Sequence, residues 1–161
     1  YAKAAWRPEP AFTSEPTMNE SLTPPIRGAG LIIALLALTA VGIVAYWTSF
    51  FFGGDVQASH EQWYLVFQRT FPVPDGAIAL CAAASALGLY RRKQWAVLWG
   101  LLAAGSLMFL GLVDTSFNVQ NNIYGQVSGE VGAEIVINIF CLSLAPILAA
   151  FLWRNRNRLE A

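Results

Sequence analysis

Four long apolar runs limit what this chain can fold into. Crossing the hydrocarbon core of a bilayer takes about 20 helical residues, and each run approaches or exceeds that length. Inside the core every backbone N–H and C=O must be bonded within the protein, which a helix achieves within one segment. The sequence therefore predicts an all-α, four-transmembrane-helix bundle, with spans at about residues 29–52, 74–90, 95–114 and 131–153.

The composition agrees with this class. Of the 161 residues, 56% are hydrophobic and 12% are charged, whereas about 25% are charged in soluble domains. The formal net charge of zero gives no bulk attraction to nucleic acid, so no nucleic-acid partner is expected. We expect one bundle, residues 29–153, preceded by an extended proline-rich arm, 1–28, and followed by a basic tail, 154–161.

Basic residues predict the orientation of the bundle, because lysine and arginine collect on the cytoplasmic side of membrane proteins. They precede the first run, separate the second from the third, and follow the fourth. The other two connections together contain only Arg69. Both termini are therefore expected on the cytoplasmic side of the cell (inner) membrane, placed there by Arg27, Arg91, Arg92, Lys93, Arg154, Arg156 and Arg158.

Three acids lie in or at the ends of the spans, all at the predicted outer level: Asp75, Asp114 and Glu134. Helical spacing places each on a stripe of small or polar residues. Such stripes mark close contacts between membrane helices, so all three acids are expected to face inward. The stripes are Asp75 with Ala79, Ala82 and Ala86; Asp114 with Gly111, Ala104 and Gly100; and Glu134 with Asn138, Cys141 and Ala145.

An inward-facing carboxylate needs a cation, a proton or hydrogen-bond donors. Arg69 is the fixed cation on the predicted outer side, so we expect it to pair with Asp114 or Glu134. Amides such as Asn118 and Asn138 would supply further hydrogen bonds. The sequence thus predicts one outer polar cluster.

Each acid also has a structural interpretation. Asp75 follows Pro72 and Pro74, as a first-turn residue favoured by the helix dipole would. Asp114 is placed at the C-terminal end of its predicted span, where an acid is disfavoured by the dipole, and fits a structural member of the cluster better than a catalytic acid. Glu134 is a functional candidate because ionisable groups inside spans are rare and usually functional.

The sequence holds none of the usual catalytic or cofactor motifs. No span contains a histidine that could ligate haem, and no phosphate-binding glycine loop or nucleophile–base pair is present. Cys81 and Cys141 lie inside spans without metal-binding spacing and fit packing roles. No catalytic residue, metal site or cofactor is therefore expected.

Three stretches, "AYWTSFFFGG", "FQRTFPVPD" and "LGLYRRKQWAVLWGLLAAGSLMFLGLVDTSFNVQNNIYG", resemble an uncharacterised family of small bacterial membrane proteins with four spans. The shared features are an aromatic end to the first span, an R-x-F-P-x-x-D segment, and an aspartate followed by amides and a tyrosine. The resemblance covers about residues 29–153. It implies the four-span fold and suggests that Arg69, Asp75, Asp114 and Tyr124 belong to one outer cluster; it implies no activity.

Two functions remain open from the sequence. The first is a non-catalytic accessory or structural subunit of a larger membrane assembly, contacting other membrane subunits and lipids through the arm and the lipid-facing helices. The second is a small-molecule or lipid-binding protein, or an isomerase-like enzyme, with an outward-facing acidic pocket. The second requires a cavity between the helices that side chains do not fill.

Overall fold

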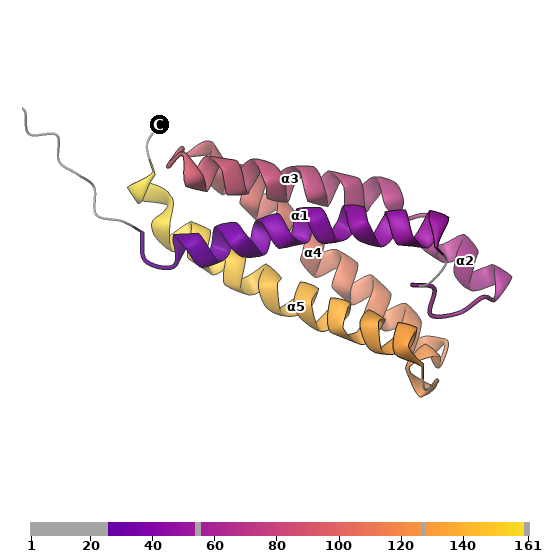
Figure 1. Ribbon diagram of the computed structural model, residues 1–161. Coiled ribbons are helices and arrows are strands. Elements are labelled where there is room, and N and C mark those ends of the chain that lie inside the picture. The colour runs from indigo at the N-terminus through magenta and orange to yellow at the C-terminus, as the bar shows by residue number, and fades with distance from the viewer. Residues whose placement is uncertain (1–25, 54–55, 127, 160–161) are drawn as a thin grey trace, which may run out of the picture.

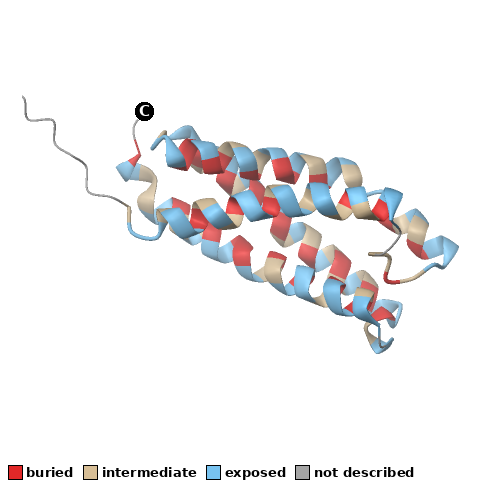
Figure 2. Cartoon of the chain, viewed as in Figure 1, coloured by how far each residue is buried: buried red, intermediate tan, exposed pale blue. Residues whose placement is uncertain are grey.

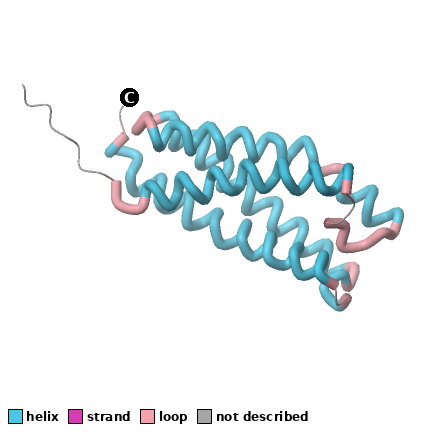
Figure 3. Tube along the Cα trace, in the orientation of Figure 1, coloured by secondary structure: helices cyan, strands magenta, loops and turns pink. Residues whose placement is uncertain are grey.

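The structure of this chain is a computed structural model that describes residues 26–53, 56–126 and 128–159. Most of the predicted N-terminal arm, residues 1–25, lies outside the described residues. Figures 1 and 3 show an arrangement of helices joined by short connections. The elements are α1 Ala29–Phe52, α2 Gln62–Gln68, α3 Pro72–Tyr90, α4 Trp95–Gln120 and α5 Gly129–Asn155, with 3-10 helices η1 Ile123–Gly125 and η2 Arg156–Arg158.

The four long helices confirm the predicted bundle. Four helical segments, which contain α1, α3, α4 and α5, are long and apolar enough to cross a membrane. The sequence places their ends as expected. Pro72 stands at the start of α3, where its missing N–H costs nothing. Ser128 caps α5 by accepting a hydrogen bond from the backbone N–H of Val131.

α4 is longer than predicted. It continues past Asp114 to Gln120, so Asp114 lies inside the helix and the expected conflict with the helix-end dipole does not arise. Asn118, one turn beyond Asp114, stays on the buried stripe. The ring of Phe117 stacks on Phe67, with 3.5 Å between ring centroids. The burial of Asn118 and the stacking of Phe117 on Phe67 stabilise the helical conformation of the polar end of α4.

The short helix α2 was not predicted. Its inward residues are Tyr64 and Gln68, four positions apart on one face, and both are buried. The Gln68 amide donates a hydrogen bond to the Tyr64 hydroxyl over 3.1 Å. α2 thus covers one end of the bundle, which we call the α2 end.

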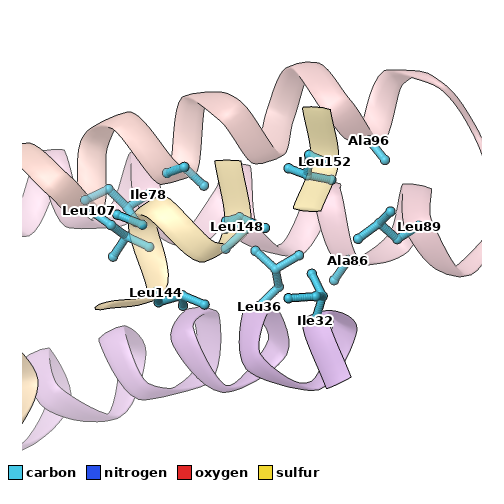
Figure 4. Packing of buried hydrophobic residues seen from close by; sticks show 14 of the residues in the cluster. Ile32, Leu36, Ile78, Ala86, Leu89, Ala96, Leu107, Leu144, Leu148 and Leu152 are labelled. Carbon is cyan, nitrogen blue, oxygen red and sulfur yellow. The ribbon is translucent and has the colours of Figure 1, made fainter. Parts of the chain in front are cut away.

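The long helices pack in sequence, α1 along α3, α3 along α4, and α4 along α5. α1 and α5 also meet where α1 begins and α5 ends. There Leu36 of α1, Ala86 of α3 and Leu148 of α5 belong to one apolar core and point toward one another (Figure 4). From that closed end α1 and α5 diverge toward the α2 end (Figure 1). The bundle is therefore a wedge.

The three predicted stripes are buried, as Figure 2 shows for the inner faces of the helices. Small residues on them allow close packing, as predicted. A Cβ added to Gly111 would lie 2.9 Å from Cγ of Leu142 on α5. Gly88, near the end of α3, is also confined: a Cβ there would lie 2.7 Å from the Ala96 Cβ and 3.0 Å from its Cα.

Gly88→Ala is expected to destabilise the bundle, because the added methyl meets the backbone of α4 and an overpacked contact costs about 1–3 kcal/mol. Gly76→Ala is the matched control on α3, since a Cβ there meets no atom within 4 Å. The control should be neutral or stabilising, given the better helix propensity of alanine. Thermal unfolding in detergent micelles measures both, and equal melting temperatures would contradict the close contact.

Candidate functional site

A cavity of about 280 Å³ lies in the wedge toward the α2 end, between α1 and α5. Most of its wall is apolar, but the three predicted acids line it from three different helices: Asp75 of α3, Asp114 of α4 and Glu134 of α5. Its other lining residues are Leu38, Thr39, Gly42, Ile43, Tyr46, Trp47, Gln68, Phe71, Leu107, Leu110, Val136, Ile137, Asn138, Phe140 and Cys141.

Asp75 is held by a hydrogen bond from α1. The indole Nε1–H of Trp47 donates to Asp75 Oδ2 over 2.8 Å, and both side chains are buried. The other oxygen, Oδ1, is buried without a hydrogen-bond partner among the described residues. Asp75 lies in the first turn of α3, as its structural interpretation required, yet it also faces the cavity with only 7% of its surface exposed.

Glu134 is the centre of a second set of polar contacts. The Asn118 amide donates to Glu134 Oε1 over a long distance of 3.5 Å. The side chains of Asp114 and Gln68 also lie within hydrogen-bonding range of the Glu134 carboxyl group. Because ionised carboxylates only accept hydrogen bonds, a bond between the Asp114 and Glu134 carboxyl groups requires a proton on one of them. The two acids thus form a pair suited to holding a proton.

Tyr124 joins the amides behind this pair. Its hydroxyl accepts a hydrogen bond of 2.8 Å from the Asn138 amide and a longer one of 3.4 Å from Asn118. Asn138 lines the cavity one turn beyond Glu134 on α5. The turn after α4 therefore braces the polar face of α5, which explains how the amide-rich segment contributes to the site.

Arg69 does not join this cluster. It ends α2 with an exposed side chain, and no ion pair to Asp114 or Glu134 is present in the part of the chain that the structure describes. Adjacent residues of a helix point in different directions. Because α2 turns Gln68 inward, the side chain of its neighbour Arg69 points away from the cluster. The expected ion pair is replaced by hydrogen bonds from neutral side chains.

Sequence reasoning missed two members of the site, Trp47 and Gln68. An aromatic residue near the end of a span is also typical of an interfacial anchor, and the sequence offers no sign that Trp47 bonds an acid on another helix. Gln68 lies on a helix that was not predicted, although its spacing of four from Tyr64 was a weak signal. Across residues 26–53, 56–126 and 128–159, no cluster of three or more side chains suited to a metal ion is found.

No family model, no curated protein and no solved structure matches this chain. The geometry of the described residues therefore carries the functional argument. The class of protein is one with four long helices, each long and apolar enough to cross a membrane, and with an acid-lined cavity in one half of the bundle.

Trp47→Phe is expected to lower the free energy of unfolding by about 1–3 kcal/mol, because it leaves both oxygens of Asp75 buried without donors. Trp63→Phe is the control, since Trp63 is exposed. Combining Trp47→Phe with Asp75→Leu should recover much of the loss, because both polar partners are then removed. Reversible unfolding in micelles tests this; a Trp47→Phe variant as stable as the control would contradict a structural role for the bond.

Proposed function

We propose that this protein binds a membrane-soluble small molecule in the cavity between α1 and α5. The observation that supports the proposal is the make-up of that cavity: apolar walls with a few converging polar groups, which is the usual composition of ligand sites. The interpretation drawn from the sequence required a space that Arg69 does not fill, and Arg69 is exposed and does not line the cavity. A volume of about 280 Å³ approaches the range of about 300–1,000 Å³ typical of ligand pockets.

The route into the cavity runs sideways, from the lipid. Two of its lining residues, Leu38 of α1 and Val136 of α5, are 59% and 66% exposed on the bundle surface. Both are apolar and lie on the two helices that diverge. A ligand with an apolar part can therefore pass between α1 and α5 without leaving the hydrocarbon region.

We also propose the orientation that the basic residues predict. The turn between α3 and α4 and the end of α5 carry the positive charges and lie at the closed end of the wedge, and Arg69 lies at the α2 end. Both termini are then cytoplasmic in the cell membrane, and the cavity lies toward the outer side. We propose as well that the chain belongs to the group of small bacterial four-span membrane proteins that it resembles.

The accessory-subunit role, the first of the two functions drawn from the sequence, stays a prediction, as do contacts with other membrane subunits and lipids. Its basis in the sequence was the proline-rich arm, most of which lies outside the described residues, together with the lack of catalytic motifs and the small-residue stripes on several helices. Binding a small molecule and serving an assembly are compatible roles. The isomerase-like chemistry considered from the sequence likewise stays a prediction, for which the Asp114–Glu134 contact would supply the proton-holding pair.

Gly42→Leu is expected to abolish ligand retention, because Gly42 lines the cavity and a side chain there enters open space. Gly30→Leu is the matched control, an exposed α1 glycine that also has room for a Cβ and does not line the cavity. Both changes improve helix propensity, so folding should be kept.

The measurement is native mass spectrometry of each protein released from membranes without added ligand. The same small added mass should be found on the wild type and on Gly30→Leu and be missing from Gly42→Leu. Equal retention by all three variants, or no retained molecule on the wild type, would reject binding in this cavity.

The orientation is tested with one added cysteine in each of two variants, His60→Cys and Asn157→Cys, both at exposed positions. On intact cells a membrane-impermeant thiol reagent should label the first and not the second, and cell lysis should expose both. The unmodified chain, whose Cys81 and Cys141 lie within the helices, gives the background. The reverse labelling pattern would mean that the bundle is inserted the other way round.

A further inference from the structure

The charges that line the cavity have one sign. Among the described residues, those that form its wall include three with carboxyl groups and no lysine, arginine or histidine. At the α2 end the described cationic side chains are those of Arg69 and, when protonated, His60, and both are exposed. A ligand with an anionic head, such as a fatty acid or a phosphate, would meet no described cationic side chain inside and would be repelled by ionised carboxyl groups.

Asp75 provides a second and independent observation. Its side chain lines the cavity, and its Oδ1 is buried and has no hydrogen-bond partner among the described residues. Leaving a buried acceptor without a donor is costly, and the cost is higher for a charged group. Trp47 occupies only Oδ2, so the missing donor at Oδ1 is one that a ligand can bring.

We infer that the ligand is an amphiphile with a protonated amine as its head, which donates a hydrogen bond to Asp75 Oδ1 while its apolar part lies between α1 and α5. This inference rests on the proposed ligand-binding function and adds the chemical class of the ligand. An ammonium group supplies both the donor and the countercharge. The Asp114–Glu134 pair lines the same cavity and adds negative charge in surroundings where electrostatic attraction is strong.

The aromatic residues of the wall suit the same head group. Tyr46, Trp47 and Phe71 line the cavity beside the acids, and aromatic faces attract cations. Phospholipids with an amine head carry a phosphate next to it, which the acids would repel. A lipophilic amine without a phosphate is therefore favoured over a membrane phospholipid.

The test uses two probes of equal chain length, octylamine and octan-1-ol. At pH 7 the amine is protonated, whereas the alcohol is a neutral donor. The protein is placed in phosphatidylcholine nanodiscs, because that head group has no N–H to compete. The rise of melting temperature with probe concentration gives an apparent Kd for each probe.

Octylamine should stabilise the wild-type protein more strongly than octan-1-ol. Asp75→Asn keeps an oxygen that can accept from Trp47 but loses the charge, so it should fold and bind octylamine about tenfold or more weakly. Glu130→Gln is the matched control, a partly exposed acid in the first turn of α5 that does not line the cavity, and its Kd should equal that of the wild type. If Asp75→Asn does not fold, the double variant Asp114→Asn/Glu134→Gln, which removes the charge of the pair, replaces it with the same expectation.

Equal stabilisation by the two probes, or an unchanged octylamine Kd in the acid-to-amide variants, would overturn the amine inference. The proposed function has its own readout, the mass retained by the wild type and lost in Gly42→Leu. If that mass is present while octylamine has no effect, the cavity binds a ligand of another class. If the wild type retains no added mass and octylamine has no effect, both the proposed function and the amine inference are wrong.

Discussion

Polar side chains inside a membrane-spanning bundle find no water in the lipid, so their hydrogen-bond partners must come from the protein or from a bound molecule. This constraint organises the α2 end of the molecule. Helices in lipid gain little from hydrophobic association, so small-residue contacts and interhelical hydrogen bonds hold them together. At the closed end the apolar core and the close contacts at glycines hold the helices together. At the α2 end the bond from Trp47 to Asp75 joins α1 to α3, and the bond from Asn118 to Glu134 joins α4 to α5.

The separation of these two bonds explains why a cavity exists. Each bond ties one pair of neighbouring helices, whereas α1 and α5 diverge at this end (Figure 1). The acids face the gap from α3, α4 and α5 because the helices that would otherwise cover them stand apart. Carboxyl groups in an apolar wall are unfavourable unless something stabilises them, and residues of this kind within membranes usually serve a function.

The sequence was sufficient for the periodic features and insufficient for contacts between helices. Apolar run lengths predicted α1 to the residue, and a turn of 100° per residue placed all three acids on buried stripes. The end of α4 was placed too early because polar residues after Asp114 look like a loop, although Asn118 and Phe117 have partners across the fold. Arg69 and Gln68 are adjacent, and only the rotation of α2 decides which one faces inward. The wedge between α1 and α5 follows from packing angles, which no local pattern encodes.

The position of the cavity has a consequence for how the protein is made. Its two side walls come from α1 and α5, the first and the last of the four long helices in chain order. During membrane insertion the first wall is in place well before the second is synthesised. Until α5 arrives, Asp114 lacks Glu134 beside it and one face of α4 is open to lipid or to a chaperone. The site is therefore complete only after all four long helices have been inserted and packed.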